Sequence, residues 1–199
     1  MKKRSWMVAL LMLLCLVVPQ KAQAKWTGVQ ILTVGAIDNL KLSEDGVFAA
    51  RASAHLFWVP EADFMLWFGY AGPRFNINDW LWLSPQIGVA GNWDPSGGDA
   101  FLTSLWAGIT PDPNVSIFLE GDFYFYGEGQ WDYYGFYSLD YMLGDISVGP
   151  TFEHVNEDLI LGPHVTLYTG VGPWMSVQYY VAAKPEFEHT VRFVTGLFF

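Results

Sequence analysis

The sequence predicts an all-β chain whose strands close into an antiparallel, up-and-down transmembrane barrel. Apolar residues alternate with mixed residues along segments of roughly 9–13 residues, about the length that a tilted strand needs to cross a bilayer. The alternation recurs over most of the chain, and aromatic residues (18%) outnumber charged ones (15%). A sheet surrounded by hydrocarbon must close on itself, because no backbone polar group can stay unpaired there.

The first 24 residues have the three-part layout of a secretory signal peptide. A basic "MKKR" precedes an apolar run from Trp6 to Val18, and "PQKAQA" supplies the small-x-small pattern of Ala22 and Ala24. The run is shorter than the roughly 20 residues of a transmembrane helix, so we expect cleavage before Lys25. The single cysteine, Cys15, lies in this leader, which leaves the mature chain without a disulfide, cysteine metal site or cysteine nucleophile.

The charge balance excludes nucleic acid as a partner. The chain has 10 Lys and Arg against 20 Asp and Glu, and four of the basic residues belong to the leader. Nucleic-acid binding depends on neutralising phosphates with Lys and Arg, which the mature chain cannot do on this balance.

Residues 25–46 are predicted to form an N-terminal segment that precedes the barrel strands. The piece from Trp26 to Ile37 is strand-like, and as a further strand it would make an odd total. Single-chain bacterial barrels have even strand numbers. We therefore expect this segment to plug or cap the barrel, or to join it in part as an extra strand.

Residues 47–199 are predicted to form the barrel itself, with ten strands, and with eight or twelve as alternatives. The segments are 47–59, 63–74, 80–91, 100–110, 114–126, 133–143, 145–154, 158–169, 173–183 and 187–199. Short turns alternate with longer connections, which is the loop pattern of transmembrane barrels. One phase of each segment carries no charge and is expected to face lipid, while the mixed phase faces a lumen. Prolines inside several strands, most after a glycine, are expected to mark bends or bulges near the rims.

The chain closes on "HTVRFVTGLFF", a half-apolar strand that ends on an aromatic residue. In this respect, and in its Tyr- and Trp-rich body, it resembles the outer-membrane β-barrel class of Gram-negative bacteria. The resemblance implies a place in the cell outer membrane, in contact with its lipids and lipopolysaccharide. It also implies that Phe193, Leu197 and Phe199 form a C-terminal signal for the barrel-insertion machinery.

The lumen phase gathers the ionisable residues. These are Arg51, His55, Glu120, Asp122, Glu153, His164, Glu188 and Arg192. One interpretation is that the arginines pair with carboxylates of facing strands, since charges removed from water need partners. The other is a constriction that selects small solutes by charge, with the arginines on one side of the lumen and Glu120 and Asp122 opposite. The predicted function is accordingly that of a structural protein or a narrow pore for small solutes.

The alternative is a lipid-modifying barrel enzyme or a ligand-binding surface receptor. His154 and His189 stand beside acidic residues in expected loops, but no serine stands at a spacing that would form a nucleophile–base pair. The acidic "DPSGGD" lacks the ligand spacing of a calcium loop. The sequence therefore assigns no catalytic residue, no metal and no cofactor.

Overall fold

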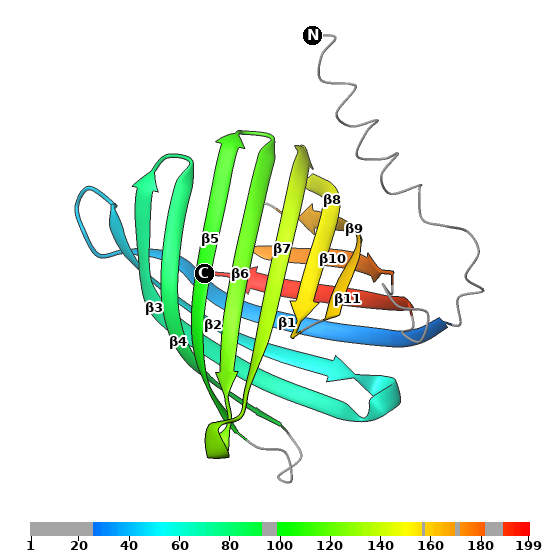
Figure 1. Cartoon of the computed structure of the whole chain (residues 1–199). Coiled ribbons are helices and arrows are strands. Elements are labelled where there is room, and N and C mark those ends of the chain that lie inside the picture. Colours follow the sequence, from blue (N-terminus) through cyan, green and yellow to red (C-terminus); the bar gives the residue numbers. More distant parts are fainter. Residues whose placement is uncertain (1–25, 93–98, 157, 170–171, 182–188) are drawn as a thin grey trace.

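The computed structural model describes residues 26–92, 99–156, 158–169, 172–181 and 189–199 (Figure 1). The predicted signal peptide lies outside the described residues. The strands are β1 (Trp26–Lys41), β2 (Phe48–Val59), β3 (Phe64–Asn78), β4 (Leu81–Asn92), β5 (Ala100–Asp112), β6 (Val115–Phe125), β7 (Trp131–Leu143), β8 (Ile146–Val155), β9 (Asp158–Tyr168), β10 (Pro173–Tyr180) and β11 (His189–Phe198). Two short 3₁₀ helices, η1 (Pro60–Ala62) and η2 (Gly127–Gly129), lie between strands. Within the described residues, no helix has the length and apolar character needed to cross a membrane.

The strands form one closed barrel, as predicted, but with eleven strands rather than ten. The ten predicted segments correspond to β2–β11 within a few residues, and the additional strand is β1, from the N-terminal segment. β1 pairs with β2 in antiparallel and with β11 in parallel orientation. An odd number of strands makes one such parallel pair unavoidable, so the expected purely antiparallel arrangement is wrong at this seam. It follows that β1 begins and β11 ends at opposite ends of the barrel.

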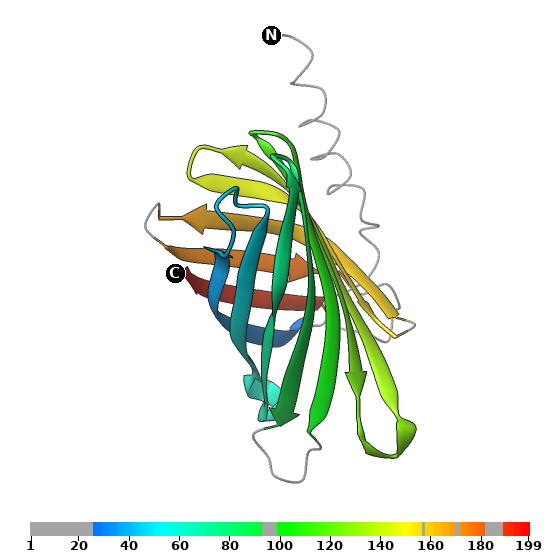
Figure 2. The same ribbon diagram turned by 90° about the vertical axis from the view of Figure 1, so that its left-hand side faces the viewer.

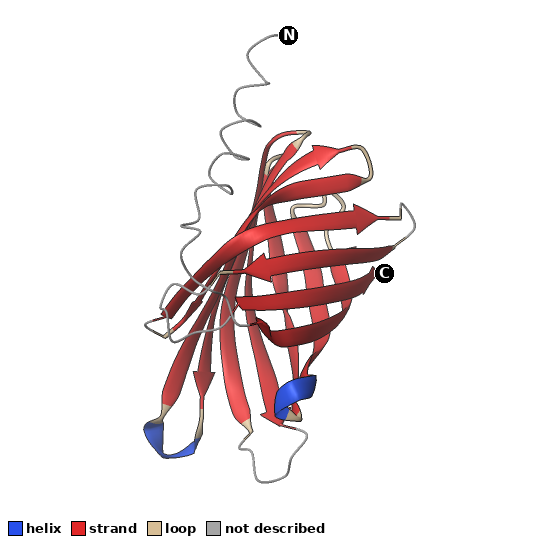
Figure 3. Cartoon of the chain, turned by 90° about the vertical axis from the view of Figure 1, so that its right-hand side faces the viewer, coloured by secondary structure: helices blue, strands red, loops and turns tan. Residues whose placement is uncertain are grey.

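The barrel is flattened, and its two walls cross steeply. In Figure 1 strands β3–β7 run down the near wall, while β9, β10, β11 and β1 run across behind them. Figures 2 and 3 show the same crossing from the two sides. Strands that pass from one wall to the other must therefore bend.

Glycines occupy the places where strands approach one another too closely for a side chain. A Cβ at Gly149 of β8 would overlap the carbonyl oxygen of Leu139 in β7, and a Cβ at Gly162 of β9 would overlap that of Tyr179 in β10. The regular β7–β8 pairing is interrupted beside Gly149, between Ser138↔Thr151 and Tyr141↔Val148. Three of the glycine–proline pairs predicted to mark bends near the rims, at 72–73, 149–150 and 162–163, lie within strands, whereas the pair at 172–173 lies at the start of β10.

Hydroxyl side chains stand beside two of the strand prolines, Pro85 and Pro150. Pro85 has no N–H to donate to the ladder, and the preceding residue, Ser84, donates its hydroxyl to the Pro73 carbonyl at 2.7 Å. Thr151, which follows Pro150, likewise donates its hydroxyl to the Gly162 carbonyl at 3.1 Å. A side-chain donor therefore stands beside each of these interruptions of the backbone ladder.

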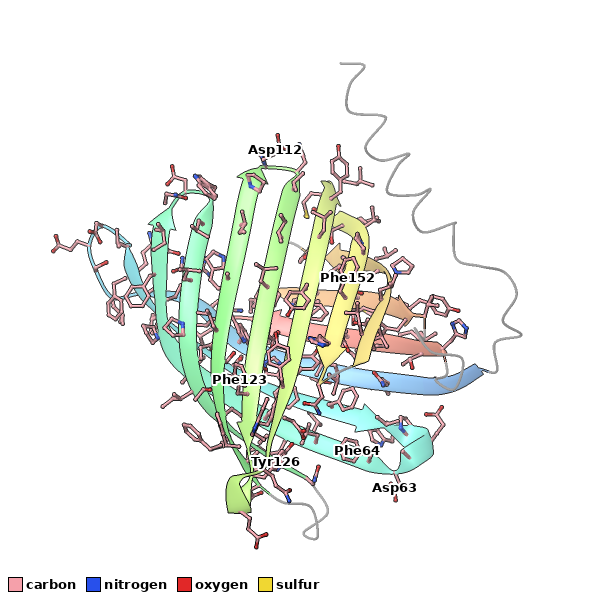
Figure 4. The ribbon with its side chains drawn as sticks, in the orientation of Figure 1. Asp63, Phe64, Asp112, Phe123, Tyr126 and Phe152 are labelled. Atoms are coloured by element: carbon pink, nitrogen blue, oxygen red, sulfur yellow. The ribbon has the colours of Figure 1, made fainter. Side chains whose placement is uncertain are left out.

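The two faces of the sheet differ as the alternation predicts. Outward residues are large and apolar on almost every strand; Phe123 of β6 and Phe152 of β8, labelled in Figure 4, are examples. Inward residues include nearly all of the buried polar and charged side chains, among them Arg51, Asp122 and Arg192. The site described next is built from this inward face.

Candidate lumenal binding site

The inward face encloses a cavity of about 710 Å³. Most of its lining is aromatic or aliphatic, contributed by strands from both walls. The large apolar lining residues include Leu32, Val34, Phe57, Leu66, Phe68, Trp82, Trp106, Phe118, Tyr124, Tyr126, Phe136, Ile160, Trp174 and Phe198. A cavity of several hundred Å³ with apolar walls and a few polar groups is typical of small-molecule sites.

The structure brings most of the predicted lumen residues to this cavity. The residues that line it are Arg51, His55, Glu120, Glu153, His164 and Arg192. Asp122 is fully buried behind the cavity wall, and Glu188 lies outside the described residues. The lining residues do not form one ring, because they are divided among separate hydrogen-bonded clusters.

Arg192 of β11 belongs to the most completely bonded cluster. Its guanidinium makes a two-point ion pair with Glu153 of β8, in which Nη1 donates to Oε1 and Nη2 donates to Oε2 at 3.0 Å. Nε and Nη2 also donate to Gln30 Oε1 of β1, at 2.9 and 2.7 Å, across the parallel seam. Tyr180 donates its hydroxyl to Glu153 at 2.6 Å. Both charges are neutralised inside the barrel, since Glu153 is 2% and Arg192 is 7% exposed.

A second cluster places two arginines on one carboxylate. Asp38 of β1 lies 2.8 Å from Arg51 Nη1 and 2.6 Å from Arg74 Nη1. Arg74 is also well bonded, because its Nε donates to Asn76 and its Nη1 to the Asp38 carboxylate. Arg51 differs, since its Nε and Nη1 make no hydrogen bond to any described residue. Arg51 Nη1 is close enough to Asp38 Oδ1 to form an ion pair, but the geometry is not that of a hydrogen bond.

Aromatic rings hold the Arg51 guanidinium in place. Its central carbon lies 4.8 Å from the ring centre of Trp82 and 4.4 Å from that of Trp106, within the range of cation–π attraction. Trp82 also carries Arg74 on its ring, at 4.2 Å. The indole of Trp82 fills the space above Gly108, where a Cβ would collide with it. The absence of a side chain at residue 108 therefore lets this ring reach both arginines.

The two acids of β6 form a third cluster. Asp122 accepts hydrogen bonds from the hydroxyls of Tyr70 (2.6 Å) and Ser104 and from Trp106 Nε1 (3.3 Å). Glu120, two residues along the same inward face, lines the cavity. Asp122 is therefore the fully bonded acid of β6, and Glu120 is the one that faces the cavity.

Asp140 of β7 organises a fourth cluster. Its Oδ1 lies 2.8 Å from His164 Nε2 and accepts the Ser147 hydroxyl at 2.7 Å, while Oδ2 accepts the Ser138 hydroxyl at 3.0 Å. Nucleophilic catalysis needs the histidine between the nucleophile and the acid. Here both serines bond the acid instead, so this arrangement of described residues does not provide an activated serine.

Several members of these clusters were not predicted from the sequence. They are Gln30, Asp38, Arg74, Asp140 and Tyr180. For two of them, the alternation of residues along the strand could have predicted an inward side chain. Arg74 lies two residues from the inward Gly72, and Asp140 lies two residues from the inward Ser138. Asp38 and Gln30 were missed because their segment was not assigned to the wall.

Within the described residues, no group of three or more His, Cys, Asp or Glu side chains is placed to hold a metal ion. Neither the protein-family models nor the curated proteins compared with this chain give a match. Its function is therefore inferred from the geometry of the barrel.

Proposed function

We propose that the protein is a β-barrel of the bacterial outer membrane whose lumen binds a small, largely apolar molecule. This proposal rests on the contrast between the two faces of the sheet. The outer face is apolar around the whole barrel, and the inner face encloses a mainly apolar cavity. A cell outer membrane, with its lipids and lipopolysaccharide, is the environment that such an outside fits.

The outer face supports the membrane part of the proposal. No Asp, Glu, Lys or Arg stands at an outward position of the described strands β2–β11. Large apolar side chains stay exposed there, including Leu105 at 56%. Soluble monomers rarely expose apolar patches larger than a few hundred Å². The outward Phe193 and Leu197, and the terminal Phe199, are also exposed, which is compatible with recognition by the barrel-insertion machinery.

The lumen supports binding more than charge selection. Arg192 and Glu153 neutralise each other, and Arg51 and Arg74 lie against Asp38. A selective constriction relies on ionised side chains that act on a passing ion. Charges held within clusters leave aromatic and aliphatic surface as the main feature that a guest molecule would meet.

Arginine substitution on the outer face tests the membrane part. Leu105→Arg, at the middle of β5, is expected to cost about 2–4 kcal/mol in lipid, whereas Ile77→Arg, near the end of β3, costs about 0–1 kcal/mol. Both side chains are similarly exposed, at 56% and 54%. If water surrounded both positions, the two substitutions would therefore have similar effects on stability. The measurement is urea unfolding of barrels folded into lipid vesicles. Equal costs for the two variants would contradict burial of β5 in a bilayer.

Blocking the lumen tests the binding part. Val34→Trp adds a large ring on the cavity side of β1, and Thr33→Trp adds the same ring on the outside. We expect calorimetric titration with 1-octanol to detect a site in the wild type and in Thr33→Trp, and at least about tenfold weaker binding in Val34→Trp. Heat-modifiable gel migration confirms that each variant is folded. Octanol uptake that is the same in both variants would place the site outside the lumen.

A narrow pore for small solutes is the second candidate, favoured by the polar clusters that reach the cavity from both walls. Planar-bilayer recording distinguishes the two functions, because only a pore gives stepwise conductance.

A further inference from the structure

Arg51 differs from the other buried arginines of the barrel in its hydrogen bonding. Arg192 donates to Glu153 and Gln30, and Arg74 donates to Asn76 and Asp38. Arg51 is as deeply buried as Arg192, at 7% exposure, yet its Nε and Nη1 make no hydrogen bond to a described residue, although Nη1 lies 2.8 Å from Asp38 Oδ1. Buried guanidinium groups normally have their N–H donors satisfied, because an unmet charged donor is costly.

The cavity adjoins this incompletely bonded guanidinium. Arg51, Asp38, Trp82, Trp106 and Phe118 all line it. The side chain of Asp38 is 37% exposed and is shared by two arginines. Another acid, Glu120, also lines the cavity. Among the printed ion pairs of this cluster, two guanidinium groups share the one Asp38 carboxylate.

We propose that Arg51 is the anchor for the acid group of an apolar monocarboxylate bound in the lumen. This inference rests on the proposed lumenal binding function and specifies its ligand class. The carboxylate of the ligand accepts from the Arg51 guanidinium, as arginine is suited to planar carboxylate recognition. The apolar body lies along the aromatic wall that begins at Trp106 and Phe118. The rings that flank Arg51 keep its guanidinium oriented before the ligand arrives.

Octanoate and 1-octanol are the probes, since they share a chain and differ in the acid group. Calorimetric titration of the folded wild-type barrel is expected to show octanoate binding about tenfold tighter than octanol, the contribution of one charged hydrogen-bonded contact. Arg51→Met should bring the ratio of octanoate to octanol affinity close to one, while Arg51→Lys keeps part of the preference. Asp38→Asn, which removes the internal competitor, should strengthen octanoate binding and raise that ratio by about tenfold.

Arg192→Lys is the matched control, because it changes a buried arginine whose donors are already occupied. It is expected to lower stability and to retain the preference for octanoate. Retention of the preference in Arg51→Met, or weaker octanoate binding in Asp38→Asn, overturns the assignment. If Arg51→Met fails to fold, the result for Asp38→Asn alone decides whether Arg51 is the anchor. Octanol binding without octanoate binding overturns the anchor and leaves the lumenal site standing, whereas absence of both overturns the site as well.

Discussion

Glu153→Ala is expected to lower the free energy of unfolding by about 3–5 kcal/mol, because it leaves Arg192 charged and unpaired inside the barrel. The substitution also removes the closer of two acceptors of the Tyr180 hydroxyl, Glu153 at 2.6 Å, and leaves Gln178 at 2.9 Å. Urea unfolding of the barrel in detergent micelles, followed by tryptophan fluorescence, measures the change. Glu128→Ala, at an exposed site in η2, should change stability by less than about 0.5 kcal/mol.

A double substitution separates the penalty of leaving Arg192 unpaired from the net contribution of the ion pair to stability. Glu153→Leu combined with Arg192→Met removes both charges and keeps apolar volume, and buried ion pairs replaced in this way often cost little. We expect the double variant to be more stable than Glu153→Ala by at least about 2 kcal/mol. If Glu153→Ala alone costs under about 1 kcal/mol, the ion pair is not closed off from water as described.

Gly162→Ala is expected to destabilise the barrel by about 3 kcal/mol or more, or to prevent its folding. The added methyl group would overlap the backbone carbonyl of Tyr179, which cannot swing aside as a side chain can. Heat-modifiable gel migration and urea unfolding report the two outcomes.

Gly35→Ala provides the comparison for this prediction, because a Cβ on that outward glycine of β1 meets nothing within 4 Å. It should fold like the wild type, with unchanged or slightly raised stability. Similar stability of the two variants would mean that β9 and β10 can separate at this point without cost.

The strands could be predicted from the sequence because lipid and lumen impose different residues on alternate positions. In β6, for example, Leu119 and Phe123 alternate with Glu120 and Asp122. β1 gave a weaker signal, since its inward Leu32, Val34 and Ala36 are as apolar as its outward residues. The even-number rule then argued against a strand that the sheet in fact contains.

The pairings inside the lumen could not be predicted in the same way. Alternation places Arg192 and Glu153 on the inward face, but their contact depends on the register of strands β8–β11 and on the flattening of the barrel. Gln30 and Asp38 complete the two arginine clusters from β1. Leaving β1 out of the wall therefore removed one partner from each cluster, although pairing of the arginines with carboxylates was one of the two interpretations of the sequence.

The parallel seam makes assembly depend on the two most distant parts of the sheet. Gln30 and Arg192 are 162 positions apart in sequence, so joining them carries the loop-closure entropy of nearly the whole polypeptide. Contact order of this kind slows folding. Until the last strand docks, the first and last edges both expose unpaired amides, which invite pairing with other chains. Ring closure should thus be the slow step in maturation and the stage most open to misassembly.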